Sequence, residues 1–517
     1  MTIDPKQRLL RNVTSNWVQM AIYTVIALVM TPFVVHALGK DVYGIWALIF
    51  SIIHYTNFFD VGFKQSLARY LPKYYATQDY EKLNEVINSS SVIYAVSGTL
   101  VLITAAIIAA FFVDYFAVSE DLLPLMRIAL IIMGVNQAMY FYLMASTALG
   151  PFHRYDLLNA IEIGRTLVGA ACTIVLLMQG YGLIALALVT LLTNFGSLLL
   201  KRFFQHRIVP QIEYNRKYVN RQRIRELFNY GLVSFLIVMA WIVIFSTDNI
   251  VVGMFISTQA VAYFNIAGTI INNLRSIVAS IGTPLVPVIS HLDATSDLAE
   301  IAALHRKTVR YLYYISTLIG VGVFFFGRQF VGLWMGPGFD TTVTILFILI
   351  APACIYLPQM ITNSVLLGIG RHPTLLYILG VEALANIGLS LALVHVWGVY
   401  GVALGTAIPQ VVIYSFVYPY VFHRTIRARL SDFYRDSGLS IATALLFTLP
   451  VAWAVSYLPL PGWVGFLAQI SAVTAVSLAG FAWRILDDAD RRRFLGRFFR
   501  SRAAGPQPPE KKTAPGR

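Results

Sequence analysis

The sequence predicts an all-α protein that crosses a membrane many times. Hydrophobic residues make up 57% of the 517 residues and charged residues only 12%, and the mean hydropathy is +0.68. Soluble domains contain about 25% charged residues, so this composition is typical of a membrane protein. Apolar runs of about 20 residues, the length that a helix needs to cross a bilayer, recur along the chain. We therefore expect about 14 transmembrane helices.

The predicted spans follow one another at short intervals. They cover residues 14–37, 43–62, 87–112, 123–148, 158–178, 181–200, 227–247, 260–290, 308–326, 342–368, 373–396, 398–422, 438–458 and 463–485. Arg275, Pro284 and Pro287 interrupt the eighth span, and we expect a bend at the prolines because proline cannot donate a backbone hydrogen bond. The first run has no small-residue cleavage site, so it is predicted to be a helix and not a secretory signal.

The basic residues predict the orientation of the chain. With the N-terminus in the cytoplasm, all but two of the lysines and arginines in loops and tails fall on the cytoplasmic side, and the exceptions are Lys40 and Arg328. Because membrane proteins keep positive residues on the cytoplasmic side, we expect both termini there. The formal net charge of +14 then favours anionic phospholipids as partners and argues against nucleic acid.

The sequence contains an internal repeat. Residues 146–158 read STALGPFHRYDLL and residues 364–376 read SVLLGIGRHPTLL, and one fixed offset aligns the glycine, the basic pair and the leucines. The same offset places residues 43–46 on residues 261–264. Each copy contains six spans, an even number, so both copies enter the membrane in the same direction. We expect two six-helix lobes related by a parallel pseudo-twofold axis, with the last two spans outside the repeat.

These features predict five parts of the chain. They are an N-lobe at 1–200, a basic cytoplasmic linker at 201–226, a C-lobe at 227–422, two additional spans at 437–486 and a basic cytoplasmic tail at 487–517. The tail has a composition typical of disorder. The longest predicted outside loop, residues 327–340, is too short for a domain, so we expect the function to reside within the membrane.

Arg275 is the first candidate for a functional residue. A charge at the centre of a spanning helix costs roughly 2.5–3.5 kcal/mol on insertion scales, so it needs a partner or a wet cavity. Arg275 stands at the edge of a polar stripe that a helical period places on one face, which comprises Asn265, Thr269, Asn272, Ser276, Ser280 and Thr283. The stripe favours a cavity in which Arg275 and Asn272 contact an anion. The alternative is an arginine bound to helix-end carbonyls near the inner leaflet.

Glu162 and Arg165 lie in the fifth span. They are three residues apart, so they can pair on one face of a helix. A self-neutralised pair between packed helices and a role in a cavity both fit this spacing. Arg165 is therefore a second candidate for anion contact, and Glu162 is a candidate coupling residue.

The end of the second span contains three more charged residues. Asp60 and Lys64 are four residues apart, and Arg69 follows five residues later. Lys64 and Arg69 are candidates for a basic cavity mouth, and the alternative is that they are ordinary positive-inside residues. Asp60 is a candidate coupling residue.

Two other carboxylates are candidate coupling residues. Glu382 lies in the eleventh span with Asn386 four residues on. It is a candidate protonation site, although it lies only about two and a half turns from the cytoplasmic end and could be hydrated. Asp248 lies at the outer end of the seventh span, where a solvated helix-end carboxylate is the simplest interpretation and a coupling role the alternative.

Motifs of enzymes and of cofactor sites are absent from the sequence. It contains no GxxxxGK[ST], no HExxH and no CxxC, and neither His54 nor His395, the histidines in or near apolar runs, has metal-ligand spacing to another ligand. We therefore expect no cofactor, no resident metal and no enzymatic activity. Cys172 and Cys354 lie in apolar runs and are expected to be free thiols.

Several segments resemble a known family. Residues 38–52 read LGKDVYGIWALIFSI and residues 58–71 read FFDVGFKQSLARYL, and the second half contains STDNIVVGMFI at 246–256 and VAYFNIA at 261–267. These segments resemble the Wzx-type flippases, the polysaccharide transporter branch of the multidrug/oligosaccharidyl-lipid/polysaccharide exporter superfamily. The resemblance covers residues 8 to about 425, and only the topology extends it to the last two spans.

The resemblance implies a flippase. Such a protein moves undecaprenyl-pyrophosphate-linked oligosaccharide, a polysaccharide or O-antigen repeat unit, from the inner to the outer leaflet of the bacterial cytoplasmic membrane by alternating access. A polysaccharide polymerase and a chain-length regulator are then candidate partners. A pyrophosphate in a low-dielectric region needs guanidinium or ammonium partners. This need favours Arg275 and Arg165 for contact and Lys64 and Arg69 for entry.

Two other classes of protein remain open. A cation-coupled multidrug antiporter of the same superfamily would share the lobes, but it would be expected to have a carboxylate-dominated cavity and more often has twelve spans. A membrane-embedded polysaccharide polymerase or ligase is the enzyme alternative. It would need reactive residues in an outside loop, where Lys40 and Arg328 are the only basic residues.

Overall fold

The computed structural model of the protein is a bundle of helices, as the composition predicts. It describes residues 5–282, 285–295, 298–487 and 490–491. Within these residues there are 16 α-helices. They are α1 (Pro5–Leu38), α2 (Lys40–Tyr55), α3 (Phe63–Ala76), α4 (Tyr80–Ile107), α5 (Leu123–Leu143), α6 (Tyr155–Met178), α7 (Leu183–Ile208), α8 (Arg221–Phe255), α9 (Thr258–Gly282), α10 (Leu285–Ala294), α11 (Leu298–Met335), α12 (Asp340–Gly368), α13 (His372–Val412), α14 (Tyr418–Ile426), α15 (Leu430–Ser456) and α16 (Gly462–Gly480).

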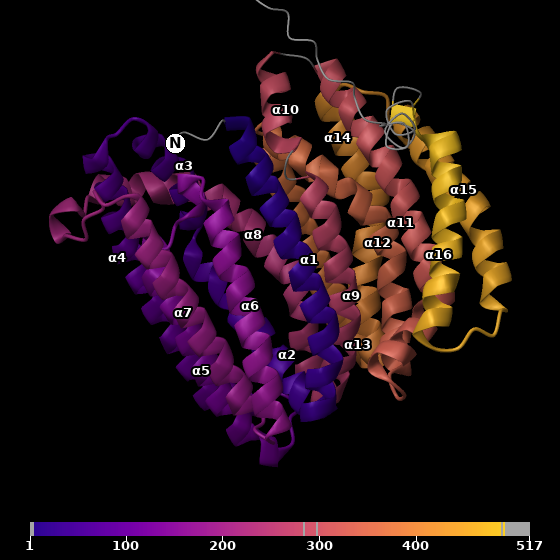
Figure 1. Ribbon diagram of the computed structural model, residues 1–517, viewed down its shortest axis with the longest axis horizontal. Helices are drawn as coiled ribbons and strands as arrows, with labels where there is room; N and C mark the ends of the chain where they lie inside the picture. The colour runs from indigo at the N-terminus through magenta and orange to yellow at the C-terminus, as the bar shows by residue number, and fades with distance from the viewer. Residues whose placement is uncertain (1–4, 283–284, 296–297, 488–489, 492–517) are drawn as a thin grey trace, which may run out of the picture.

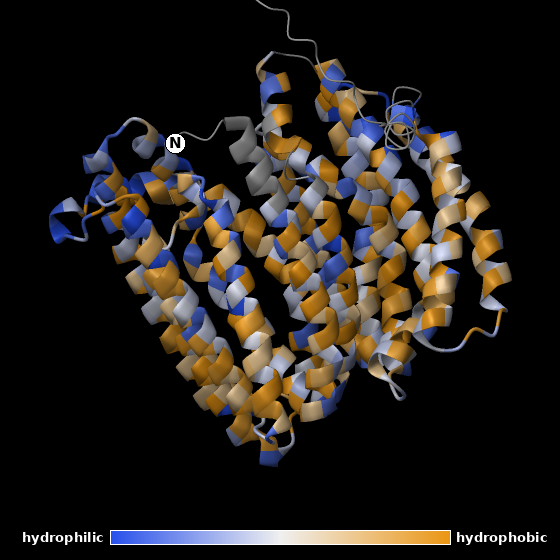
Figure 2. Ribbon diagram, in the orientation of Figure 1, coloured by the Kyte–Doolittle hydropathy of each residue, from blue (hydrophilic) through white to orange (hydrophobic). Residues whose placement is uncertain are grey.

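The helices form two groups. Figure 1 shows α4 to α7 on one side and α11 to α16 on the other, with α8 and α9 between them. The groups converge near α2, where α2 packs against α9, and the N-terminus and α3 lie at the opposite end. The loops at the N-terminal end are strongly hydrophilic, whereas hydrophobic residues dominate the lengths of the helices (Figure 2). This distribution is the one that a bilayer imposes on a bundle of helices.

Twelve helical segments of the described chain are long and apolar enough to cross a membrane. One of them, His372–Ile426, extends over 55 residues and contains a bend at Gly398, whose φ of 55° and ψ of −134° lie outside the helical region. The predicted boundary between spans eleven and twelve falls at this bend. The 25-residue helix α9 is not one of the twelve. The predicted multi-pass helical protein is therefore confirmed.

Local sequence explains where several helices begin. The Asp79 carboxylate accepts a hydrogen bond from the Lys82 amide before α4, and the Asn220 side chain accepts one from the Gln222 amide before α8. Both residues are favoured N-caps because a side-chain oxygen satisfies a free amide at the helix start. Gly39, with a φ of 79°, is the single residue that separates α1 from α2. This reversal needs glycine because residues with a Cβ rarely adopt a positive φ.

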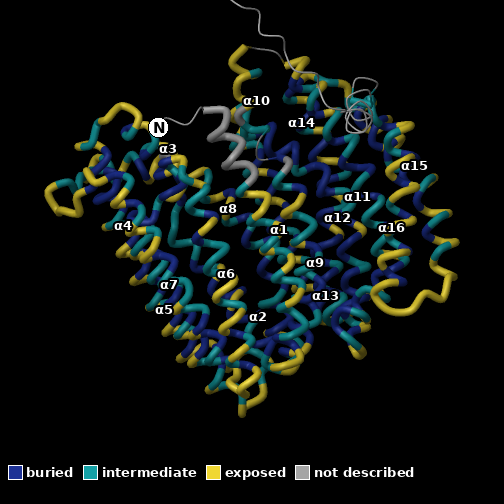
Figure 3. Tube along the Cα trace, in the orientation of Figure 1, coloured by how far each residue is buried: buried dark blue, intermediate teal, exposed yellow. Residues whose placement is uncertain are grey.

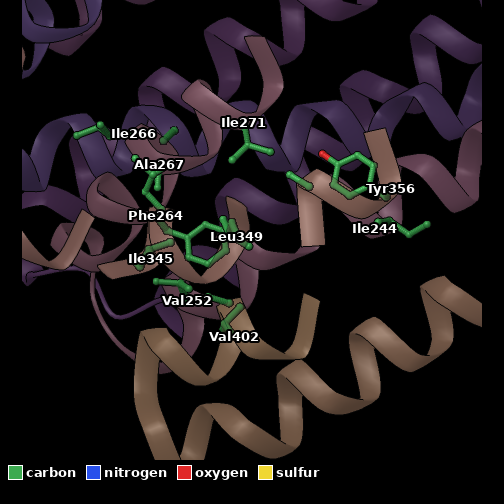
Figure 4. Close-up of a cluster of buried hydrophobic side chains, with 14 of the residues drawn as sticks. Ile244, Val252, Phe264, Ile266, Ala267, Ile271, Ile345, Leu349, Tyr356 and Val402 are labelled. Carbon is green, nitrogen blue, oxygen red and sulfur yellow. The ribbon is translucent and has the colours of Figure 1, made fainter. Parts of the chain in front are cut away.

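A large apolar core lies where the two groups meet. Its side chains come from α8, α9, α12 and α13 and include Ile244, Phe264, Leu349, Tyr356 and Val402 (Figure 4). The buried residues follow the centre of the bundle, whereas many apolar side chains on the outer helices are exposed (Figure 3). An exposed apolar face on a spanning helix is expected because lipid replaces water around it.

The helices are longer than the predicted spans at several points. Helix α7 continues to Ile208 and α8 begins at Arg221, so the predicted linker at 201–226 is helical at both ends. Helix α11 continues to Met335, which shortens the predicted outside loop 327–340 to four residues between α11 and α12. Helix α9 ends at Gly282 and α10 begins at Leu285, and Pro284 lies outside the described residues. The predicted tail, apart from a few residues at its start, also lies outside them.

Candidate functional site

A cavity of about 560 Å³ with polar groups in its wall lies between helices of the first half of the chain. Helices α1, α2, α6 and α7 line it, and Asn265 reaches it from α9. Its polar lining consists mainly of hydroxyl and amide groups, which include Thr31, Thr166, Thr173, Thr190, Thr193 and Asn194. Arg165 contributes a guanidinium to the same wall. A cavity of this kind offers hydrogen bonds to a polyhydroxylated ligand and one cation to an anion.

Arg165 is held by a network of polar side chains. Its Nε donates to Glu162 Oε2 over 2.8 Å and its Nη1 donates to Asn194 Oδ1 over 3.1 Å. The ammonium group of Lys201 pairs with the other oxygen of Glu162. Glu162 is therefore shared by two cations, and the group retains a positive charge. The predicted pair of Glu162 and Arg165 is confirmed.

Lys201 is a member of this network that sequence reasoning missed. It follows the predicted sixth span and belongs to the predicted linker, but α7 continues past it. Asn194 and Lys201 are seven residues apart, which places them on one face of α7. Asn194 also donates to Asn136 Oδ1 on α5 over 2.9 Å. The seven-residue spacing of two polar residues next to an apolar run is the signal that could have identified Lys201.

Arg275 lies between aromatic side chains near the centre of the molecule. Its Cζ is 3.8 Å from the centroid of the Phe245 ring, a cation-π contact. The phenols of Tyr356 and Tyr414 and the imidazole of His54 lie within electrostatic range of the guanidinium. Its Nη1 is buried and has no hydrogen-bond partner among the described residues. No ion pair between Arg275 and a described carboxylate is present, and Arg275 does not line the cavity that contains Arg165.

The polar stripe on α9 runs beside Arg275. Asn265 accepts a hydrogen bond from the Tyr43 hydroxyl over 3.0 Å, and Asn272 and Ser276 are exposed. Ser276 donates to the backbone carbonyl of Asn272 over 2.9 Å. Thr283, the last predicted member of the stripe, lies outside the described residues.

The three charged residues near α3 have different surroundings. Lys64 and Arg69 are exposed on α3 at the N-terminal end of the molecule, and Arg69 lies over the ring of Tyr70. Asp60 is partly buried and accepts hydrogen bonds from the Tyr94 hydroxyl over 3.1 Å and from the Lys64 amide over 3.3 Å. The structure places these residues away from the Arg165 network, because none of them lines the cavity that contains Arg165.

Asp248 and Glu382 are both buried in the second half of the chain. The side chain of Asp248 is 5% exposed, so the simplest expectation, a solvated helix-end carboxylate, is wrong. Its Oδ2 accepts from Thr406 Oγ1 over 2.7 Å, and Asn386 Nδ2 donates to the same Thr406 oxygen over 2.9 Å. Because α13 bends at Gly398, Thr406 and Asn386 lie side by side against α8. This arrangement explains why Asp248 is enclosed.

These buried groups leave several oxygens without a partner. Oδ1 of Asp248, Oδ1 of Asn386 and both carboxylate oxygens of Glu382 have no hydrogen-bond partner among the described residues. Glu382 is 1% exposed, so it is buried, whereas the sequence had left open whether it is hydrated. The phenols of Tyr356, Tyr414 and Tyr418 lie within its electrostatic range. Oxygen ligands of this type bind hard cations or protons. The described residues contain no group of three or more histidine, cysteine or acidic side chains that could hold a metal ion.

The two halves of the chain are joined at the end where α1 meets α2, which we name the closed end. Lys40 Nζ donates to the Gly338 carbonyl over 2.9 Å and to the Tyr263 hydroxyl over 3.2 Å. Thr258 Oγ1 donates to Asp41 over 3.0 Å, and Trp334 Nε1 donates to the Leu28 carbonyl over 2.6 Å. With the bond from Tyr43 to Asn265, these are five of the hydrogen bonds that connect the halves.

The fold and this arrangement define a class of protein. The multidrug resistance MATE transporter of the MOP superfamily, in its inward-facing conformation, is 15% identical and superposes with a TM-score of 0.64 over 81% of this chain and 96% of that chain. The lipid II flippase MurJ, in its inward closed conformation, is 16% identical and superposes with a TM-score of 0.68 over 91% of this chain and 98% of that chain. The protein therefore has the fold of the MOP superfamily.

The family is shown by the sequence. The model of the family described as polysaccharide biosynthesis protein matches residues 9–293, and the chain belongs to this family. The uncharacterized membrane protein EpsK of Bacillus subtilis is 20% identical over 95% of this chain and 97% of its own length. The uncharacterized membrane protein MJ1068 of Methanocaldococcus jannaschii is 23% identical over 69% of this chain and 72% of its own length. The resemblance to the polysaccharide branch of the superfamily is thus confirmed.

Proposed function

We propose that this protein is a flippase for lipid-pyrophosphate-linked oligosaccharide, which it moves from the inner to the outer leaflet by alternating access. The family and the likeness to a lipid flippase support this proposal. The observation that carries it is the guanidinium of Arg275, which has a buried donor without a partner and no described carboxylate in an ion pair. An arginine in this state binds phosphate groups through charge-assisted hydrogen bonds, whereas a cationic cargo would be repelled.

We also propose the membrane topology. Counting α9 as a crossing and dividing α13 at Gly398 brings the twelve candidate spans to fourteen. The parts 1–200 and 227–422 are then two lobes related by a pseudo-twofold axis, and 437–486 adds two spans. With the N-terminus in the cytoplasm of a bacterial cell, the closed end faces outward and the molecule is in an inward-facing conformation.

The charged residues suggest a route for the substrate. Lys64 and Arg69, exposed at the cytoplasmic end, attract the anionic headgroup. Arg275 and Asn272 of the second lobe and Arg165 of the first then contact the pyrophosphate and the first sugars. The lipid tail stays in the bilayer. A polysaccharide polymerase and a chain-length regulator, which would use the exported unit, are the protein partners of this proposal, and anionic phospholipids surround the cytoplasmic face.

The decisive experiment measures translocation in proteoliposomes that contain the purified full-length protein. An undecaprenyl-pyrophosphate oligosaccharide is incorporated, and a sugar-binding probe added outside reports on its exposure. The wild-type protein is expected to expose the sugar, and Arg275→Ala is expected to reduce the rate at least tenfold, because loss of a charge-assisted hydrogen bond costs roughly 1.5–3 kcal/mol. Arg275→Lys keeps the charge without the planar donor fork and should have an intermediate rate.

Arg328→Ala is the matched control for this experiment. Arg328 is exposed, pairs with Asp340 over 3.1 Å and does not line the cavity that contains Arg165. It should leave the rate unchanged. Normal translocation by Arg275→Ala at equal reconstitution would contradict the anion contact, and no translocation by the wild-type protein would contradict the flippase.

We propose Asp248 as the main coupling residue and Glu382 as a second one. Both carboxylates are buried and have oxygens without partners. A cation or a proton that is driven into the protein by the membrane potential or by a concentration gradient can bind there. Glu162 and Asp60, which were also candidates, already accept hydrogen bonds from cationic or phenolic groups. Coupling roles for these two require that such contacts open during transport.

Asp248→Asn tests the coupling proposal in the same proteoliposomes. The amide keeps the bond to Thr406 but removes the charge, so translocation should lose its dependence on an imposed sodium gradient, proton gradient or potential. Glu120→Gln, which changes an exposed acid at the start of a short 3-10 helix between α4 and α5, should keep the dependence of the wild-type protein. A gradient dependence that is unaltered in Asp248→Asn would rule out a coupling role for Asp248.

A cation-coupled small-molecule antiporter is the second candidate. The same buried carboxylates favour it, because cation coupling needs a site of this type, and the fold is shared with a multidrug transporter. The antiporter predicts gradient-driven uptake of soluble organic cations into proteoliposomes in the absence of any lipid-linked sugar. Uptake of this kind, without sugar exposure, would favour the antiporter over the flippase.

A further inference from the structure

A second polar pocket lies at the N-terminal end of the molecule, separate from the cavity of Arg165. It has a volume of about 400 Å³ and is enclosed by the beginning of α11, the end of α14 and the beginning of α15. Figure 1 shows these three helix ends close together on the side of α10 and the N-terminus. The charged side chains that line it are Arg306, Arg310, Arg427, Arg429, Asp432 and Asp436.

The positive charge of this pocket is only partly neutralised. Arg306 pairs with Asp436 and Arg310 pairs with Asp487. Arg427 and Arg429 are exposed, and neither forms an ion pair with a carboxylate in the part of the chain that the structure describes. These two guanidinium groups therefore present free donors at the pocket.

The backbone adds donors to the same place. Helix α15 begins at Leu430, next to the lining residue Arg429, and no side chain caps its first turn, so its first amides have no side-chain partner. Arg427 ends α14 in the left-handed conformation, with a φ of 56°, and this turn brings the chain back to the start of α15. The α11 wall consists partly of the small residues Ala299, Ala302 and Ala303, which leave room for a ligand.

We propose that this pocket binds the phosphate of an anionic phospholipid headgroup. Basic pockets between spanning helices at the cytoplasmic surface bind such groups, and arginine forks with free helix-start amides match a phosphate. Helix α15 continues from the pocket with exposed Leu439, Leu446 and Leu449, an apolar track for acyl chains. The chain's own segment 492–517 is rich in lysine and arginine and contains a single acidic residue, Glu510, so its charge is wrong for this pocket.

The test compares two variants of the full-length protein in detergent micelles. The probe is dioctanoyl phosphatidylglycerol, with dioctanoyl phosphatidylcholine as a neutral reference, and binding is measured by native mass spectrometry. Arg427→Gln combined with Arg429→Gln should weaken phosphatidylglycerol binding about tenfold or more, because each basic residue contributes to attraction of an anionic headgroup. The control combines Arg424→Gln with Arg484→Gln, which removes two exposed charges near the same face but outside the pocket.

Competition with inorganic phosphate distinguishes a site for phosphate itself from a site that requires the whole lipid. If phosphate displaces phosphatidylglycerol and its effect is lost in the pocket variant, the site recognises phosphate itself, and a soluble phosphate can occupy it as well. If phosphate does not displace the lipid but the variant still weakens lipid binding, the acyl chains along α15 are required. Equal weakening in the pocket variant and the control, or binding of phosphatidylcholine as strong as that of phosphatidylglycerol, would overturn the proposal.

Discussion

The partners of charged residues in the spanning helices can be predicted from the sequence only where they are close in the sequence. Glu162 and Arg165 are local in sequence, so a helical period was enough to predict their pair. Lys201 reaches Glu162 from 39 residues away on another helix, and no local pattern contains that information. The surroundings of Arg275 show the same limit, because Phe245 and Tyr356 come from α8 and α12. A sequence therefore predicts which charges need partners, whereas the fold selects the partners.

Glu162→Gln tests the shared carboxylate. The substitution leaves Arg165 and Lys201 without their common anion in a partly buried place, so we expect the free energy of unfolding to fall by about 1–2 kcal/mol, less than for a fully buried pair. The measurement is the thermal unfolding midpoint of the purified protein in detergent. Glu120→Gln removes an exposed carboxylate and should leave the midpoint unchanged. An equal midpoint for both variants would show that Glu162 contributes no stability.

Helices as units and the break at Gly398 were predicted well, but the contacts that form at such junctions were not. Apolar runs identified the spanning helices, because each run must satisfy its own backbone in lipid. The bend in α13 at Gly398 depends on a positive φ, and its effect is to bring Thr406 and Asn386 against Asp248 on α8. The contact of α2 with α9 depends on Gly44, where a Cβ would lie 1.8 Å from the Thr258 carbonyl oxygen. Neither close approach leaves a periodic signal in the sequence.

Gly44→Ala should open the closed end. The added methyl group overlaps the backbone of α9, and overpacking of this kind costs roughly 1–3 kcal/mol. We expect a cysteine placed at Asn265 to react with a membrane-impermeant maleimide about tenfold faster in Gly44→Ala than in the parent protein.

Gly268→Ala is the control for that comparison. Gly268 lies in the same helix as Thr258, and a Cβ at Gly268 would have no atom within 4 Å. Its reaction rate should match that of the parent. An unchanged rate in Gly44→Ala would mean that the two helices can separate without altering access to Asn265.

Composition and charge predict the class of the whole molecule. Its low content of charged residues indicated a multi-pass helical protein, and the matched family model and the MOP superfamily fold agree with that class. The symmetry of the two lobes and the orientation in the membrane remain predictions. Both rest on patterns that extend over hundreds of residues, the repeat and the distribution of basic loops.

Cysteine labelling from one side of the membrane tests the orientation. In a background with Cys172→Ala and Cys354→Ala, Tyr181→Cys and Arg424→Cys place single thiols at exposed positions at opposite ends of the molecule. In intact cells an impermeant maleimide should modify Tyr181→Cys only, and permeabilisation should expose Arg424→Cys. Modification of both or of Arg424→Cys alone in intact cells would contradict cytoplasmic termini.

The closed end also sets the energy scale on which the molecule can change state. The five hydrogen bonds described above, which Leu28, Lys40, Asp41 and Tyr43 form with the second half of the chain, are each worth roughly 0.5–1.5 kcal/mol net. Inverting a two-state population from 1:99 to 99:1 requires about 5.5 kcal/mol. The two quantities are of the same order. A change of state at this end therefore needs a compensating interaction of similar size elsewhere in the molecule.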